Sequence, residues 1–181
     1  DKPDLRNPLV INDITEVFSR EDVSFEIFKK LIKSGSKVRC ISTKNTKDKP
    51  RSFFDNIDKW AKEQGASGLA YFTFEKDTEL SGKGPIGKFF SKEALSEIMN
   101  LTNAEVGDSI FLACGKQNEL EKITSQARNK IAEDLDLKKL IISHHSPDRT
   151  DDQIEKISAK YKNSNLIFAQ ENKEISFYGK T

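Results

Sequence analysis

The chain has 181 residues, of which 33% are charged and 35% apolar, and its 30 basic and 29 acidic residues leave a net charge of +1. This composition is too apolar for a disordered chain, and the charge balance does not by itself demand a nucleic-acid partner. No apolar run reaches the ~18 residues of a membrane span, and the polar N-terminus excludes a signal peptide. Cys40 and Cys114 end or interrupt apolar strands, which predicts reduced thiols and a cytoplasmic protein.

The first half of the chain predicts helices and strands in alternation. Ser24 is the expected N-cap of the first helix, and Gly35 its stop. A polar loop over residues 43–50 separates the first long strand from the second helix. In chain order, the expected elements are an extended lead-in (1–10), a short edge element (11–18), a helix (25–33), a strand (38–43), a helix (51–64) and a strand (69–74).

The stretch from Leu80 to Cys114 predicts the centre of the fold. A Gly-rich turn at Gly82-Lys83-Gly84-Pro85 leads into an expected helix over 85–100. The run 109–114 is apolar between turn residues, which is typical of a strand buried on both faces. We therefore expect Phe111, in the middle of that strand, to be a core residue.

The last part of the chain begins with its clearest helix, 116–135, in which apolar residues recur every three or four positions. A strand (137–142), a helix (150–162) and two short strands (166–168 and 175–177) should follow. Together the pattern predicts an α+β fold, an antiparallel or mixed sheet with helices packed on it. We expect a domain over residues 1–135 and a strand-helix-strand appendage over 136–181.

Two histidines, His144 and His145, are the only ones in the chain, and they precede Asp148. Histidine at the end of a strand beside carboxylates is a possible zinc ligand. Two histidines without further ligands upstream do not complete a site, so the prediction is a solvated loop, with weak metal binding as the alternative.

Two other features allow contact with phosphate. Glycines before a helix can cradle a phosphate, with Lys83 adding charge, although the spacing matches neither a Walker A loop nor a dinucleotide fingerprint and a tight turn is the simpler alternative. Bases also outnumber acids between residues 29 and 51, as a solvated surface or as an RNA-facing patch. The candidate RNA-binding residues are Lys29, Lys30, Lys33, Lys44, Lys47 and Lys83.

Three separated blocks resemble the insertion domain of bacterial-type aspartyl-tRNA synthetases, called the GAD domain. They are DKPDLR at 1–6, the stretch Phe53–Ala70 with its Trp60-Ala61 pair, and GPIGKFFSKEALSEIMNLTNAEVGDSIFLACG from Gly84. The blocks occur in the family's order and cover about residues 1–135. The resemblance implies a GAD-like sheet with helices packed on it.

The resemblance also implies a context. Enzymes of this family are class II, charge tRNA with aspartate using ATP and magnesium, and are homodimers; this implies tRNA and the rest of the synthetase as partners. Their catalytic motifs lie outside the insertion, so no catalytic residue and no cofactor is assigned to this chain. Contact with the acceptor end of tRNA is the role usually proposed for the insertion.

The C-terminal stretch LIISHHSPDRTDDQIEKI, from Leu140, does not resemble the synthetase. It is similar to the C-terminal strand, histidine motif and helix of hydrolases with the metallo-β-lactamase fold, but the upstream metal ligands of those hydrolases are absent. The alternatives to a synthetase domain are thus a stand-alone binding or structural module and, least favoured, a truncated metallo-hydrolase.

Overall fold

The computed structural model describes residues 7–137, 140–142, 156 and 166–168. The chain forms two units, Leu9–Ile131 and a second made of residues 1–8 and 132–181. In the second unit, β6 (Leu140–Ile142) pairs in parallel with β7 (Leu166–Phe168). Of the predicted helix 150–162 only Lys156 is described, as helical, and the last predicted strand and both histidines lie outside the described residues.

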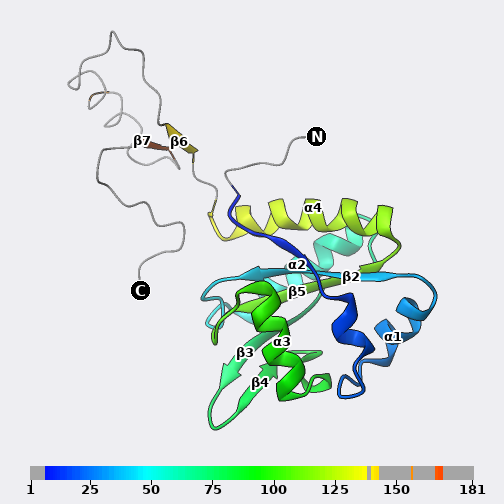
Figure 1. The fold of residues 1–181 in the computed structure, drawn as a ribbon. Coiled ribbons are helices and arrows are strands. Elements are labelled where there is room, and N and C mark those ends of the chain that lie inside the picture. The colour runs from blue at the N-terminus through cyan, green and yellow to red at the C-terminus, as the bar shows by residue number, and fades with distance from the viewer. Residues whose placement is uncertain (1–6, 138–139, 143–155, 157–165, 169–181) are drawn as a thin grey trace. The chain divides into compact units, whose positions relative to one another are not determined.

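The first unit contains a five-stranded, fully antiparallel sheet in the order β1-β2-β5-β3-β4 (Figure 1). Helices α2 and α4 cover one face, and α1 and α3 lie on the other. The α+β prediction is confirmed. The strands are β1 (Ile11–Asp13), β2 (Lys37–Thr43), β3 (Ala70–Lys76), β4 (Leu80–Lys83) and β5 (Ser109–Gly115); the helices are α1 (Glu26–Lys33), α2 (Arg51–Glu63), α3 (Lys92–Thr102) and α4 (Gln117–Asp134), with 3-10 turns η1 (Thr15–Ser19) and η2 (Gly87–Phe89).

Strand β5 is central, and its apolar run is explained by burial on both faces. Ile110 and Leu112 join a core cluster with η1 and α3 on one side. On the other side the ring of Phe111 stacks on Phe54 of α2, with 5.6 Å between ring centroids, and lies 6.4 Å from the ring of Tyr71. Side chains of one strand alternate between faces, so an all-apolar strand needs a helical layer on each side.

Two sequence predictions about helix starts were wrong. The helix expected from Pro85 begins at Lys92, because Ser91 is the N-cap and its hydroxyl accepts a hydrogen bond from the Ala94 amide at 3.0 Å. The residues before it instead form β4 and η2. Ser24 does not cap α1: the N-cap is Phe25, and the Ser24 amide donates to the Phe89 carbonyl.

The glycines of this segment allow close backbone packing of β4 on η2. A Cβ added to Gly87 would lie 2.1 Å from the Gly82 carbonyl oxygen, and one added to Gly82 would lie 2.8 Å from the Gly87 Cα. Gly84 has φ +136°, a conformation that side chains rarely allow. Packing therefore accounts for this Gly-rich sequence.

Gly87→Ala is expected to lower the free energy of unfolding by about 1–3 kcal/mol, because the new methyl group must displace backbone atoms in a packed site. Gly115→Ala is the matched control, since nothing lies within 4 Å of its added Cβ. Urea melts of both variants measure the difference. Equal stability of the two would show that β4 and η2 are not packed as described.

Candidate nucleic-acid interface

The six candidate lysines lie at two opposite ends of the sheet. One end, here the α1 end, is where β2 begins and β5 finishes, with Lys37 opposite Gly115. The other, the Lys44 end, is where β2 finishes and β5 begins, with Thr43 opposite Ser109. A strand of seven residues is about 20 Å long, so the two groups lie at separate places on the surface.

Lys29, Lys30 and Lys33 belong to α1 at the first end. The aromatic side of this helix is anchored, since the rings of Phe28 and Phe18 lie 5.3 Å apart. Lys30 and Lys33 are consequently exposed. Lys29 is partly buried, and its ammonium donates a hydrogen bond to the Arg20 carbonyl at 2.8 Å. Its role is therefore structural.

Lys44 lies at the other end and is held by a buried carboxylate. Its ammonium lies 2.9 Å from Asp108, whose side chain is 2% exposed, and it also donates to the Asn103 carbonyl. Asp108 accepts the backbone amides of Asn45 and Glu105 at 2.9 and 2.8 Å. These contacts join the loop after β2 to the turn before β5. The Lys44 ammonium is already bound within the protein, so it has little capacity to bind a ligand.

Lys83 lies at the same end as Lys44, on the neighbouring edge of the sheet. Thr43 of β2 pairs with Ser109 of β5, which in turn pairs with Thr73 of β3. Thr73 pairs with Lys83 of β4, so all four residues lie at the same end of the sheet. The Lys83 ammonium binds Glu75 at 2.9 Å, and this hydrogen bond, with Asp77 and Asp48 nearby, raises its pKa. Lys83 is thus already neutralised by acids.

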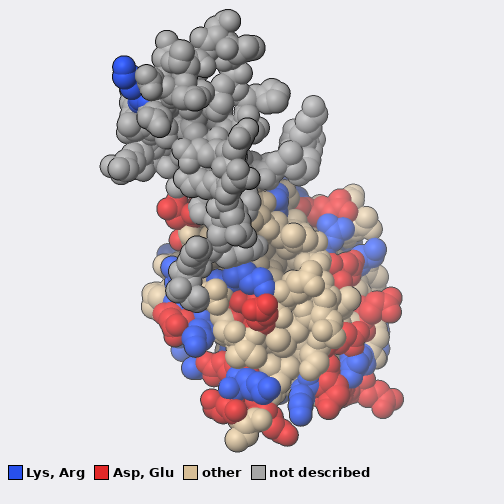
Figure 2. Space-filling view, turned by 60° about the vertical axis from the view of Figure 1, so that its left-hand side comes forward, with Lys and Arg blue, Asp and Glu red and all other residues tan. Residues whose placement is uncertain are grey.

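Figure 2 shows the molecule turned so that the left-hand side of Figure 1 comes forward. On this face, basic and acidic side chains are interspersed around an uncharged area. No continuous basic surface is visible on that face. Lys47 is exposed, but Asp48 follows it in the same loop. The Lys44 end therefore offers an RNA backbone little net attraction.

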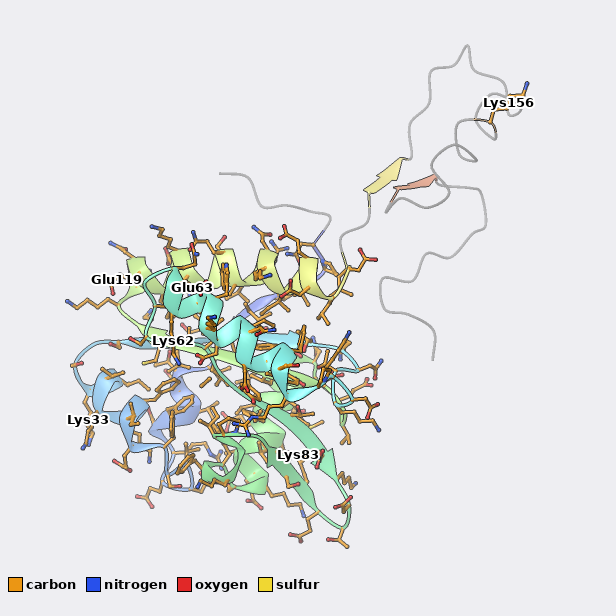
Figure 3. The ribbon with its side chains drawn as sticks, turned by 180° about the vertical axis from the view of Figure 1, so that it is seen from behind. Lys33, Lys62, Glu63, Lys83, Glu119 and Lys156 are labelled. Carbon is orange, nitrogen blue, oxygen red and sulfur yellow. The ribbon has the colours of Figure 1, made fainter. Side chains whose placement is uncertain are left out.

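The α1 end also carries basic residues that the sequence prediction did not include. Lys37 starts β2, and Lys116 precedes α4, so strand pairing brings both beside the end of α1. Lys122 is exposed on α4. Figure 3 shows Lys33 and Glu119 at the same side of the molecule, far from Lys83. Only the register of β2 on β5 reveals this grouping, which is why spacing along the chain missed it.

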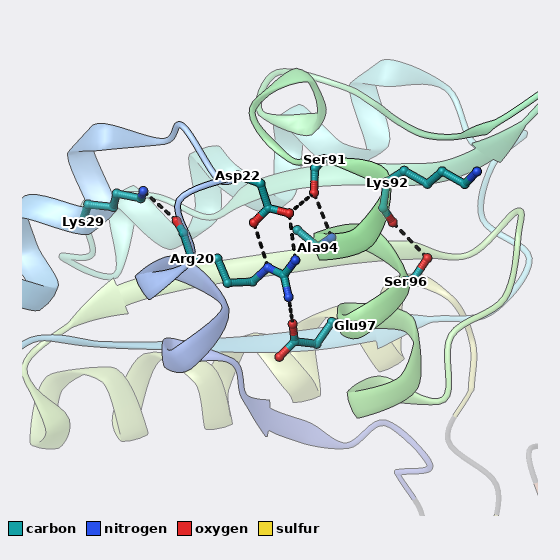
Figure 4. Close-up of polar contacts among 8 residues, drawn as sticks. All are labelled: Arg20, Asp22, Lys29, Ser91, Lys92, Ala94, Ser96 and Glu97. Atoms are coloured by element: carbon teal, nitrogen blue, oxygen red, sulfur yellow. Dashed lines mark hydrogen bonds and ion pairs between the residues drawn. The ribbon is translucent and has the colours of Figure 1, made fainter.

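A polar group on the α3 side of the sheet resembles a catalytic cluster but is used for structure (Figure 4). Arg20 binds both oxygens of Asp22, at 2.8 and 2.7 Å, and Glu97 at 2.6 Å. Ser91 donates to Asp22 while it caps α3. The hydrogen bonds from Arg20 and then Ser91 hold the pKa of Asp22 well below its usual range. The group fastens the start of α3 to the segment before α1.

Asp22→Asn is expected to weaken the acid dependence of folding. An unfolded aspartate takes up a proton near pH ~3.9, whereas folded Asp22 stays charged, so its contribution is present above about pH 4 and is lost as the pH falls toward 2. Urea melts between pH 5 and 2.5 should show a shallower decline for the variant. Glu16→Gln, at an exposed carboxylate, should keep the wild-type decline; the same slope in all three proteins would contradict the assignment.

The described residues provide no group of three or more His, Cys, Asp or Glu side chains placed to hold a metal ion. Cys40 and Cys114 are free, and burial raises their pKa values to about 12 and about 11. Both thiols are therefore protonated at neutral pH and are poor nucleophiles or ligands. Among the same residues, no helix combines the length and apolar character needed to cross a membrane.

The family model of the GAD domain matches residues 28–124, which is more than half of the chain. The chain belongs to the GAD domain family. This confirms the resemblance seen in the sequence. The matched range of the GAD domain takes in most of α1, the central strands and the start of α4, so it includes the α1 end of the sheet.

Curated relatives of this GAD domain are much longer proteins. An aspartate–tRNA(Asp/Asn) ligase of Pelagibacter ubique is 77% identical over 137 residues, which are 76% of this chain and 23% of that protein. Ligases of the same name from Beijerinckia indica and Methylocella silvestris are 46% and 48% identical over 140 residues, 77% of this chain and 24% and 22% of theirs. The chain thus spans about a quarter of the length of these relatives.

Proposed function

We propose that this GAD domain is an accessory, non-catalytic module of an aspartate–tRNA ligase and contacts tRNA phosphates through the exposed lysines of the α1 end. The observation that carries the proposal is the grouping of exposed Lys30, Lys33 and Lys116 there, with Lys37 beside Asp13, whereas Lys44 and Lys83 form ion pairs with acids. Phosphate contacts need only well-placed cations. The names of the relatives supply tRNA as the partner.

The proposal places the chemistry elsewhere in the ligase. ATP and magnesium are the expected co-substrate and metal of such enzymes, but the carboxylates of the described residues do not cluster as a metal site, so those residues do not fit that role. We further propose that the parent ligase is a cytoplasmic homodimer and that residues 1–135 are its insertion. The appendage at 136–181, with its resemblance to metallo-β-lactamase-fold hydrolases, stays a prediction.

A binding titration tests the RNA contact. Fluorescence anisotropy with labelled tRNA(Asp) and an unrelated tRNA should show weak binding of both at ~50 mM salt, with affinity falling by a log–log slope of about 0.7–0.9 per phosphate contact. Lys30→Glu/Lys33→Glu should lower binding of both tRNAs alike. Lys47→Glu/Lys59→Glu makes the same charge change elsewhere and should lower it less.

Two outcomes would contradict the proposal. If wild-type chain binds no tRNA at ~50 mM salt, or if both double variants bind equally well, the α1 end is not an RNA surface and a purely structural module is favoured. The chain alone should also show no aspartate-dependent exchange of pyrophosphate into ATP. Such exchange would overturn the non-catalytic assignment.

A further inference from the structure

A cavity of about 500 Å³ opens at the α1 end of the sheet. Three separate parts of the chain form its walls: the end of α1 with the turn after it, the turn after α2, and the end of β5 with the first turns of α4. Its lining residues are Leu31, Ser34 and Ser36, then Gln64–Gly68, then Ala113–Lys116 with Glu119, Leu120, Lys122, Ile123 and Gln126.

The lining consists of an apolar floor and a polar rim. Leu31, which is 40% exposed, supplies the accessible apolar surface, and the buried Ala113, Leu120 and Ile123 complete the apolar part of the lining. Gln64 and Gln126 add neutral amides, which can both donate and accept hydrogen bonds. Such a mixture of apolar surface and a few polar groups is typical of a site for a small organic group, and the volume falls in the usual range of ~300–1,000 Å³.

The charges around the cavity favour an anionic partner. Lys116 and Lys122 line it, and Lys33 and Lys37 flank the serines that line it from the other side. Glu119 is the one acid among the lining residues, and the exposed Glu63 flanks Gln64. A phosphate ion alone would contact the lysines but not the apolar floor of the cavity. A regular RNA duplex could present only its phosphates. An unpaired nucleotide offers both a flat base and flanking phosphates.

We propose that this cavity receives one unpaired nucleotide of an RNA, with its base against Leu31 and Ile123 and the flanking phosphates on the surrounding lysines. The inference rests on the proposed RNA contact and makes it more specific. It predicts a preference for single-stranded over double-stranded RNA at equal charge, because only an unpaired base can leave its strand and enter the cavity.

Cys114 provides an internal reporter of occupancy. It lines the cavity and is partly exposed, whereas Cys40 is fully buried. Alkylation of the 181-residue chain by iodoacetamide at pH ~9 should be slow, because the pKa of Cys114 is raised to about 11, and it should modify Cys114 before the fully buried Cys40. A saturating eight-nucleotide single-stranded RNA should slow that reaction at least about fivefold, and an eight-base-pair RNA duplex should not.

A filling substitution tests the cavity directly. Gln126→Trp should weaken binding of the fluorescein-labelled single strand about tenfold, while the lysines, and hence the slope of affinity with salt, stay unchanged. Ser125→Trp, at the neighbouring exposed position outside the cavity, is the matched control and should bind within twofold of wild type. Ser67→Trp fills the cavity from the exposed turn after α2 and repeats the test without altering α4.

The outcomes separate the two proposals. Unchanged binding by both filled variants, or unchanged alkylation of Cys114 at saturating RNA, would overturn the nucleotide site while the tRNA contact stands. Equal affinity for single strand and duplex would do the same. If wild-type chain binds neither tRNA nor the single strand at ~50 mM salt, the proposed RNA contact itself fails.

Discussion

Replacing Phe111 with alanine is expected to lower the free energy of unfolding by about 3–5 kcal/mol, the usual cost of removing a large buried ring. Phe111 is 1% exposed in the middle of the central strand. Its ring stacks on Phe54 and lies 6.3 Å from the ring of Phe53. Because these contacts join β5 to α2, the surrounding groups cannot easily close the cavity that alanine would leave.

Urea denaturation followed by circular dichroism measures this loss. Val106→Ala is a suitable control, since Val106 is 46% exposed and its truncation should change stability by less than about 0.5 kcal/mol. A loss under 1 kcal/mol for Phe111→Ala would mean that α2 does not cover this face of the sheet.

Asp108→Ala should cost about 2–4 kcal/mol. The carboxylate is buried and accepts two backbone amides, which alanine would leave without partners, and it also loses the ion pair with Lys44. Asp48→Ala, at an exposed position of the loop after β2, is the control. Thermal melts of the two variants should differ by several degrees; similar melting temperatures would show that the group around Asp108 adds little.

The role of Asp108 bears on tests of RNA binding at Lys44. Reversing Lys44 to glutamate would place two carboxylates together in a partly buried site, so any loss of binding would be mixed with loss of folding. Lys30 and Lys33 are exposed on α1 and carry no such complication. They are therefore the better positions for charge reversal.

Periodicity predicted those elements that are stabilised by their own apolar pattern. Strand β5 and helices α2 and α4 begin and end within one or two residues of the expected positions. The start of α3 was missed because Pro85 and Ser91 are both good start signals, and only packing decides between them. Strand β4 was missed because its four residues carry no apolar pattern, and its one glycine, Gly82, is explained only by its contact with Gly87 of η2.

The candidate interface was less predictable than the fold. Lys33 and Lys44 are close in sequence, and a basic run suggested one patch, but the extended strand between them puts them at opposite ends of the sheet. Lys33 and Lys116 are distant in sequence, and the pairing of β2 with β5 brings their ends together. Such grouping depends on strand register, which no local pattern determines.

Mapping the tRNA contact by NMR tests the proposed interface most directly. Unlabelled tRNA(Asp) is added to the ¹⁵N-labelled 181-residue chain at ~50 mM salt, and backbone amide shifts are followed. We expect the largest changes at residues 30–37 and 113–122, with residues 43–50 and 80–84 little affected. Changes confined to the latter two ranges, or none at saturating tRNA, would contradict an RNA contact at the α1 end.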